Sequence, residues 1–404
     1  MVHETDGLLG HKVLPTNTND AAQQEQVIQR KTRLVSLLSL LVISVVGVVY
    51  RKSTILTGGE LKEATMMELR LIKESKKQQV CEDGSYSKRS LKLAYGVPFA
   101  ALFEDSRGER KFEASDVIKV DDKYYAVHDN SWAISQFSVA LKHFSAENVQ
   151  IGNPNREPDE SAYEAIVHSD GIFYVIRESI DIPQDGEEKS QEDYHAIVEE
   201  LRLSATDYEI VNKCRSEFAF EGASKGFEGA FGIKDINSSF FVVGLCEGNY
   251  CSEKYKKERG NGMLVVMQKT VSDDGDCMWS TIKKIKIPKT AFFQDYSSIA
   301  VNEKGRVVIS SQEDSKIWIG QLTGLQENGL YDIDQMSLVD SNEPEVYDFP
   351  MNDNCEVIYC NIEGVFWIND DMLVAVSDKM KGKGKQPFRC FDKDQSVHVF
   401  VLPS

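Results

Sequence analysis

The sequence is short of positive charge. Lysine and arginine together number 46 against 64 aspartate and glutamate residues, which gives a net charge of −18 at pH 7. Because the phosphates of nucleic acid would repel such a chain, the composition argues against nucleic acid as a partner. An acidic surface suits cations, calcium above all, although surplus acid more often serves solubility alone.

Histidine is also scarce, and long apolar runs are nearly absent. The seven histidines show no spacing typical of a metal site, and only His128 falls near the candidate residues described below. One uncharged run of 17 residues covers positions 34–50, with basic residues on both sides. It lacks the charged face of a core helix and the small residues that precede a signal-peptide cleavage site. We therefore expect an uncleaved transmembrane signal anchor.

This anchor sets the expected domain organisation. We predict a disordered cytosolic tail over residues 1–33, the transmembrane helix over 34–50, a helical stalk over 51–90 and one large domain over 91–404. The charges beside the anchor balance, so they do not decide its orientation. All eight cysteines and the glycosylation sequon Asn237-Ser238-Ser239 lie beyond the anchor, which fits an oxidising lumen or the cell exterior. The sequence thus predicts a single-pass type II membrane protein of the secretory pathway, either vacuolar or lysosomal or at the cell surface.

Two pairs of cysteines share a local spacing. Cys246 and Cys251 are separated by four residues, and so are Cys355 and Cys360. We expect a local disulfide within each pair. Four such cysteines could instead hold zinc, but the spacing is loose for that metal.

From about Leu91 the chain changes to short β-rich runs separated by Gly, Asn, Asp and Pro, which predicts an all-β domain. Five segments repeat one pattern: a Ser or Glu, an apolar run, a polar turn, a second apolar run and an acidic residue. Successive Ser or Glu positions lie 49, 64, 69 and 66 residues apart. This period suits a four-stranded blade, so we predict a five-bladed β-propeller, with a sixth, degenerate blade as the alternative. The fifth repeat lacks an outer strand, which residues 91–95 can supply to close the ring.

The repeated residues are candidates for one shared site. In order they are Ser115, Glu164, Glu228, Ser297 and Glu363. At the start of each innermost strand they would meet at one mouth of a central channel, where three facing carboxylates would repel one another. Calcium accepts six to eight oxygen ligands with tolerant geometry, so we predict that these five residues bind calcium. The alternative is that each glutamate accepts backbone hydrogen bonds and no metal binds.

A second acidic set ends the repeats: Asp129, Glu178, Glu247, Glu313 and Asp378. Because the second strand of a hairpin ends beside the start of the first, this set should surround the same mouth. We predict that Asp129 or Glu178 orients water as a catalytic acid. Arg177 and Lys379 are the residues predicted to hold a small anionic substrate or ligand such as a phosphate. The basic run that begins at Lys379 could equally be a solvated loop.

The ring order and several local stretches resemble those of soluble calcium-activated apyrases. The stretches are Glu113–Val117, Tyr125–Asp129, Asp295–Ser298 and Ser311–Asp314. That family consists of five-bladed propellers that hydrolyse nucleoside diphosphates, and it includes type II membrane forms. The resemblance implies calcium ligation by the five ring residues and an acid near metal-bound water at Asp129.

The sequence also departs from the apyrase pattern. The Asp-Arg-Thr-Gly stretch of those enzymes is replaced by Asn130-Ser131-Trp132-Ala133, so the arginine is absent. The Phe-Glu-Gly and Ile-Glu-Gly openings of two repeats are equally similar to the esterase-like phytase family of propellers. Two functions stay open: a calcium-dependent hydrolase of a phosphorylated or ester substrate, and a non-catalytic binding or scaffold propeller with structural calcium.

Overall fold

The computed structural model describes residues 89–109, 111–153, 160–179, 194–222, 225–249, 251, 258–381 and 386–403. The chain divides into two units, Met1–Gln78 and Gln79–Ser404, and every described residue belongs to the second. The predicted cytosolic tail, the predicted anchor, Cys81 and nearly all of the predicted stalk lie outside the described residues. Among the residues that are described, no helix is long and apolar enough to cross a membrane.

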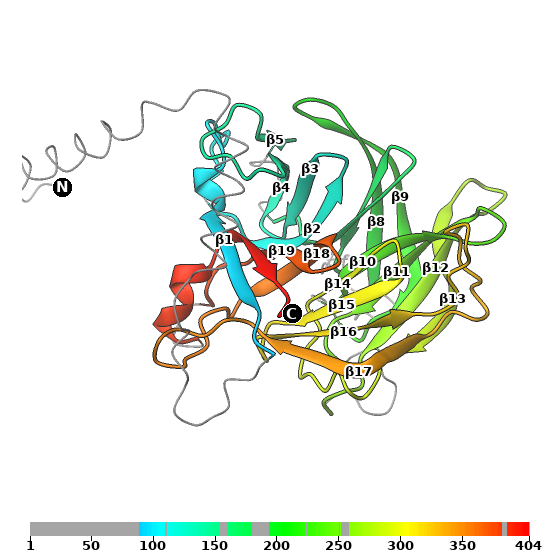
Figure 1. Ribbon diagram of the computed structural model, residues 1–404. Coiled ribbons are helices and arrows are strands. Elements are labelled where there is room, and N and C mark those ends of the chain that lie inside the picture. Colours follow the sequence, from blue (N-terminus) through cyan, green and yellow to red (C-terminus); the bar gives the residue numbers. More distant parts are fainter. Residues whose placement is uncertain are drawn as a thin grey trace, which may run out of the picture. The chain divides into compact units, whose positions relative to one another are not determined.

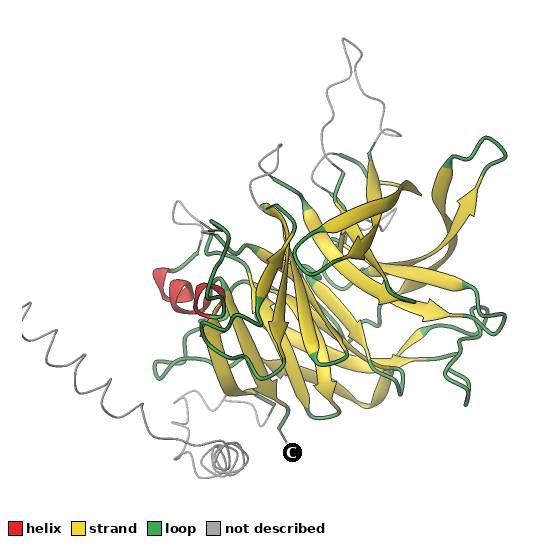
Figure 2. Ribbon diagram, turned by 90° about the horizontal axis from the view of Figure 1, so that it is seen from above, coloured by secondary structure: helices red, strands yellow, loops and turns green. Residues whose placement is uncertain are grey.

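Strands make up almost all the regular structure of the described residues (Figure 2), beside the short 3-10 helices η1 (Phe99–Ala101) and η3 (Phe388–Lys393). The strands form five four-stranded antiparallel units. Unit 1 contains β2 (Ala114–Val120), β3 (Lys123–His128), β4 (Ser131–Ser138) and β5 (Val149–Ile151). Unit 2 contains β6 (Tyr163–Ser169), β7 (Ile172–Arg177), β8 (His195–Leu203) and β9 (Tyr208–Ala219). Unit 3 contains β10 (Phe227–Lys234), β11 (Phe240–Cys246), β12 (Met263–Val271) and β13 (Cys277–Lys286).

Unit 4 contains β14 (Ser298–Val301), β15 (Arg306–Ser311), β16 (Lys316–Leu322) and β17 (Leu338–Asp348). Unit 5 contains β18 (Ile362–Asn369), β19 (Met372–Ser377), β20 (Ser396–Val401) and β1 (Lys92–Pro98). The pairing of β1 with β20 means that a strand from the start of the domain completes the last unit, as the sequence predicts. Units 2 and 3 are further joined into one eight-stranded sheet by a short parallel pairing of β9 with β13.

The innermost strands of the units form a closed ring. Strands β2, β6, β10, β14 and β18 each contact the next in that order, and β18 contacts β2 again. Figure 1 shows four of them, β2, β10, β14 and β18, gathered toward the centre of the domain, with outer strands around them. The result is an all-β, β-propeller-like fold.

Local sequence explains why each unit begins with a hairpin. Strands β6 and β7 are joined by the two residues Asp170 and Gly171, both with positive φ (51° and 78°). Two-residue hairpin loops with φ above zero at both positions favour Asp-Gly, because glycine carries no Cβ that would clash there. The turn therefore sets the register in which the first two strands of unit 2 pair.

The hydrophobic core lies between neighbouring units. Trp132 of unit 1 packs with Tyr163 of unit 2, and Trp318 of unit 4 belongs to a cluster shared with unit 3. Three similar clusters fill the other boundaries between units. Since burying a large apolar side chain contributes about 1.5–3 kcal/mol, the contacts between units hold the ring together.

Three disulfides connect described residues: Cys214–Cys277, Cys246–Cys251 and Cys360–Cys390. The predicted Cys246–Cys251 bond is confirmed, but the predicted Cys355–Cys360 bond is wrong. Cys355 lies in a tight turn with φ of 60°, whereas Cys360 lies beside η3, where Cys390 meets it. All seven described cysteines are disulfide-bonded, which removes the zinc alternative for them. These bonds are consistent with an oxidising secretory or extracellular location.

Candidate functional site

Four of the five predicted ring residues are the extra residue of a β-bulge at the start of their units. In unit 1, Ala114 pairs with His128 and Asp116 with Val127, which leaves Ser115 unpaired between them. The same shift in register occurs at Glu164, Glu228 and Glu363. In unit 4, Ser298 pairs with Ser310, whose carbonyl also accepts a 3.0 Å hydrogen bond from the backbone N–H of Ser297. Because a bulge redirects the side chain of the extra residue, these five positions are structurally equivalent.

The structure brings the three ring glutamates together. Burial raises the pKa values of Glu164, Glu228 and Glu363 well above the ordinary range, and repulsion from neighbouring carboxylates raises them further. For Glu164 the strongest repelling neighbour is Glu228, and Glu363 is repelled by Asp378 and Glu228. Three carboxyl groups from three units therefore share one poorly solvated space, which we call the mouth.

The two ring serines differ in their hydrogen bonding. The hydroxyl of Ser115 has no hydrogen-bond partner, although the residue is only 2% exposed. The hydroxyl of Ser297 contacts the Ser310 hydroxyl at 3.1 Å and donates to the Ile362 carbonyl at 3.0 Å. Leaving a buried hydroxyl without a hydrogen-bond partner costs stability. A ligand in the mouth that contacts the Ser115 oxygen would remove that cost.

Four members of the second acidic set surround the mouth at equivalent places. The backbone N–H of each donates to the carbonyl of the residue just before its unit's innermost strand, at 2.9–3.1 Å. The four residues are Asp129, Glu178, Glu247 and Asp378.

Glu313 does not take the fifth equivalent place, which is that of Gln312 directly after β15. Residues 312–315 form the turn after β15, in which Ser315 donates its N–H to the Gln312 carbonyl, and Glu313 is exposed within it. Gln312 is buried instead, and its side-chain amide donates to a carboxylate oxygen of Glu363. Unit 4 therefore presents a neutral amide to the mouth.

Carboxyl groups gather most closely where unit 1 meets unit 5. One oxygen from each of Glu113, Asp129 and Asp378 lies within 4.8 Å of the others. Burial and the neighbouring carboxylates raise the pKa of Asp129 to about 8. Burial likewise raises the pKa of Asp378 to about 6 and that of Glu178 to about 7. These groups can therefore hold or release protons near neutral pH, which general acid–base chemistry requires.

Lysine amines lie around the carboxyl groups. Lys225 pairs with Glu247 at 2.7 Å, and Lys379 pairs with Glu113. Lys381 instead donates to the neutral side-chain carbonyl of Gln312, at 2.8 Å. The sequence pattern identified Lys379 but missed Glu113 and Lys225, which lie outside the repeated positions. It also missed Gln312, which directly follows β15 where the other units have an acid.

The surroundings of Arg177 favour a structural role over the predicted contact with an anion. Its guanidinium is buried, donates to the Ser161 carbonyl at 2.7 Å and pairs with Glu199 at 3.3 Å. It also lies 4.6 Å from the centre of the Trp132 ring. Arg177 is paired with Tyr163, the residue before the bulge, so its side chain enters the boundary between units 1 and 2.

His128 is likewise a core residue, although Asp129 follows it. Its ring packs against Phe99 and Phe112, and its Nε2 atom is 2.7 Å from the Ser135 hydroxyl. Burial lowers its pKa to about 3, so the ring is neutral at physiological pH.

The mouth has a floor. Just beyond the bulge, the carboxyl group of Asp116 accepts hydrogen bonds from the Ile166 N–H (3.1 Å) and from the Ser298 hydroxyl (3.3 Å). A Cβ atom at Gly364 would lie 2.9 Å from the Asp116 Cα, so the inner strands meet closely here. A separate cavity of about 200 Å³ lies between the five inner strands, on the side of Asp116 that faces away from the mouth. The axis is therefore blocked beneath the mouth.

No protein-family model matches the sequence, and no curated protein matches it. Solved structures with a similar fold include the glutaminyl cyclase of Myxococcus xanthus, with 10% identity, a TM-score of 0.41, and 78% of this chain and 97% of that chain covered. An α-L-arabinofuranosidase from Lactobacillus brevis gives 14% identity, a TM-score of 0.42 and coverage of 72% and 90%. A streptogramin B lyase gives 9% identity and a TM-score of 0.36, with 76% of this chain and 97% of that chain covered. Likeness at this level carries no information on activity.

Proposed function

We propose that the mouth binds a divalent cation, with calcium as the physiological ion. The observation that carries the proposal is the convergence of Glu164, Glu228 and Glu363 on β-bulges of three different units. Glu164 is buried and Glu228 and Glu363 are partly buried, and carboxylates that repel one another in such a space are stabilised in the ionised form by a cation among them.

The chemistry of the donors favours calcium. The ring offers carboxylate and hydroxyl oxygens alone, which are the ligands of hard cations such as calcium. The unpartnered hydroxyl of Ser115 and the unpartnered, buried carboxylate oxygens of Asp129 and Glu247 add to the free acceptors. The alternative, in which backbone amides satisfy the glutamates, finds no support, since among the described residues no backbone N–H donates to the side chain of Glu164, Glu228 or Glu363.

We further propose that the protein is a hydrolase of a phosphorylated or ester substrate. A cation in the mouth would polarise a phosphate or carbonyl oxygen. Asp129 and Glu178 flank the ring and hold protons near neutral pH, so either can orient a water molecule and exchange a proton with it. We place this activity in the secretory pathway, on a type II membrane protein that carries a glycan at the exposed Asn237.

The second candidate is a binding or scaffold protein in which calcium only rigidifies the mouth. The involvement of Arg177 in the contact between units 1 and 2 favours it, because that guanidinium is then engaged with Glu199 and Trp132 and is not available to an anionic ligand.

Calcium titration of the chelator-treated protein by calorimetry tests the common part of the two proposals. Release of phosphate from a panel of nucleotides and sugar phosphates, with calcium and with chelator, separates them. The hydrolase proposal expects calcium-dependent turnover, whereas the scaffold proposal expects a calcium-dependent rise in melting temperature and no turnover. A protein that does not bind calcium contradicts both.

A further inference from the structure

The three lysines of the mouth differ in what they contact. Lys225 and Lys379 each form an ion pair with a carboxylate, so much of their charge is neutralised. Lys381 donates to an amide oxygen of Gln312, which carries no net charge. Unit 4 has a glutamine where the other units have an acid. Among the described residues, the amine of Lys381 therefore pairs with an amide oxygen and with no carboxylate.

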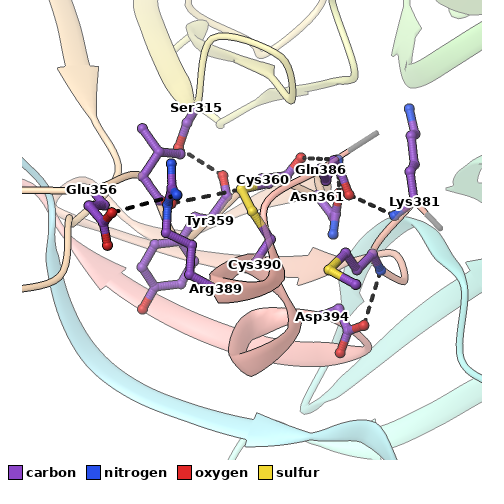
Figure 3. Close-up of a disulfide and its surroundings, with 12 residues drawn as sticks. Ser315, Glu356, Tyr359, Cys360, Asn361, Lys381, Gln386, Arg389, Cys390 and Asp394 are labelled. Atoms are coloured by element: carbon purple, nitrogen blue, oxygen red, sulfur yellow. Dashed lines mark hydrogen bonds and ion pairs between the residues drawn. A yellow bond between two sulfur atoms is a disulfide. The ribbon is translucent and has the colours of Figure 1, made fainter. Parts of the chain in front are cut away.

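Lys381 is also held in place. Its backbone N–H donates to the side-chain oxygen of Gln386 at 2.6 Å, and the Gln386 amide in turn contacts Asn361. The preceding N–H, of Met380, donates to Asp394 at 3.0 Å. Figure 3 shows these contacts beside the Cys360–Cys390 disulfide, with Lys381 at one end of the group. The backbone N–H groups of Met380 and Lys381 are thus tied to the segments that lead into β20 and, through Gln386 and Asn361, into β18.

A short chain of hydrogen bonds connects Lys381 to the ring. The amine donates to Gln312, and the Gln312 amide donates to Glu363. The charge of Lys381 also acts on Glu363, Glu247 and Asp378. The amine therefore lies beside the position at which the ring glutamates would hold a cation, while Lys381 itself is exposed to solvent.

We propose that Lys381, positioned by Gln312, forms a subsite for a phosphate-type oxyanion next to the cation of the mouth. This inference rests on the proposed cation site and adds the residue that contacts the ligand. Without a cation the surrounding carboxylates would repel an anion, so the cation binds first. By linkage, the oxyanion then tightens cation binding by the factor by which the cation tightens oxyanion binding.

The test measures the two ligands separately by calorimetry, with calcium alone and then with inorganic phosphate at saturating calcium, below the concentrations at which the salt precipitates. The wild type is expected to bind phosphate with calcium and not with chelator. Lys381→Gln should weaken phosphate binding by roughly tenfold to a hundredfold, the usual value of a charge-assisted hydrogen bond. It should leave calcium binding unchanged or tighter, because a repelling charge is removed.

Two further variants test the geometry. Lys381→Arg keeps the charge and should retain phosphate binding to within about threefold. Gln312→Glu gives Lys381 a carboxylate partner, and should weaken phosphate binding while it tightens calcium binding. Lys316→Gln is the control, because Lys316 pairs with Asp348 and belongs to neither set of ligands.

Phosphate binding that is equal in the wild type and in Lys381→Gln, with calcium bound in both, overturns the subsite and leaves the cation site intact. Phosphate binding that persists in chelator also overturns it. Absence of calcium binding in the wild type overturns the proposed function and the subsite together.

Discussion

The hydroxyl of Ser298 donates a 3.3 Å hydrogen bond to the Asp116 carboxyl group across the axis of the domain, and it accepts a 3.1 Å hydrogen bond from the Val365 N–H. Asp116 also accepts a hydrogen bond from the Ile166 N–H. These groups come from β2, β6, β14 and β18, and Ser298 and Asp116 are both fully buried. This small network fixes how four of the inner strands meet directly below the mouth.

Removal of the Ser298 hydroxyl should therefore destabilise the domain. Ser298→Ala leaves the buried Val365 N–H without its partner and takes one donor from Asp116, at a cost of about 1–3 kcal/mol in the free energy of unfolding. Urea unfolding at pH 7 measures the change. Ser169→Ala, which removes a hydroxyl bonded to an exposed neighbour, should change it by less than about 0.5 kcal/mol. Equal stability of the two variants would contradict the role given to the network.

The metal-free protein should lose stability as the pH rises from about 6.5 to 8.5. Burial and repulsion raise the pKa values of Asp129 to about 8 and of Glu178 to about 7. A raised pKa in the folded state contributes stability that is present below the unfolded pKa, near 4, and is lost as the pH rises through the folded value.

The buried histidines do not disturb this window. The pKa values of His128 and His398 are lowered to about 3, so their contribution is present above pH 6.5 and is lost only as the pH falls toward 3. Melting temperatures measured in chelator at half-unit steps of pH check the prediction. Calcium should flatten the curve, because it stabilises the ionised carboxylates. A melting temperature that rises with pH in this window would be the contrary result.

Glu228→Gln separates two effects of the ring carboxylates, the destabilisation of the metal-free protein by their repulsion and the binding of calcium. The variant removes one buried charge from the ring, so its metal-free melting temperature at pH 8 should exceed that of the wild type. The rise in melting temperature on adding calcium should shrink, because a carboxylate ligand is lost. Glu313→Gln is the matched control, since Glu313 is an exposed acid and its loss should change neither value. The prediction fails if both variants respond to calcium as the wild type does.

The repeat in the sequence was sufficient to place the ring residues. A Ser or Glu at one offset from a hairpin turn should occupy one place in every unit, and the structure gives the same bulge to four of the five. The repeat could not show what faces that place from elsewhere. Lys225 reaches the mouth from a connection outside the repeat. The basic run that contains Lys381 was predicted at the mouth, but its hydrogen bonds to Gln386 and Gln312 depend on tertiary contacts.

Two interpretations of single residues went wrong or lost support for the same physical reason. Arg177 is the last residue of β7 and precedes Glu178, so the sequence suggested that its side chain reaches the mouth. In the structure Arg177 pairs with Tyr163, the residue before the bulge, and its guanidinium packs against Trp132. Cys360 is close to Cys355 in sequence, but the turn at Cys355 separates them, and Cys390 arrives from the connection between β19 and β20. Local spacing carries no information on such partners.

The proposed hydrolase makes Asp129 the residue whose loss should stop turnover without disturbing the fold. Its carboxyl group has one buried oxygen without a hydrogen-bond partner, and it lies near the ring through its repulsion of Glu164 and Glu363. Asp129→Asn keeps the shape of the side chain but cannot exchange a proton, so kcat for calcium-dependent phosphate release should fall by about 10²–10⁴-fold. Calcium affinity, measured by calorimetry, should change far less than kcat, because the amide retains a carbonyl oxygen.

The pH profile then distinguishes a proton-transfer group from a residue that only shapes the mouth. In the wild type, the rate should follow the ionisation of one group that titrates below pH 8 once a cation is bound, because positive charge lowers the pKa of a nearby carboxyl group. This dependence should vanish in Asp129→Asn and persist, with a lower rate, in Asp129→Glu. A residual rate in Asp129→Asn that keeps the wild-type pH profile would assign the proton transfer to another group, and Glu178, with its pKa near 7, is the residue at the mouth that could take that part.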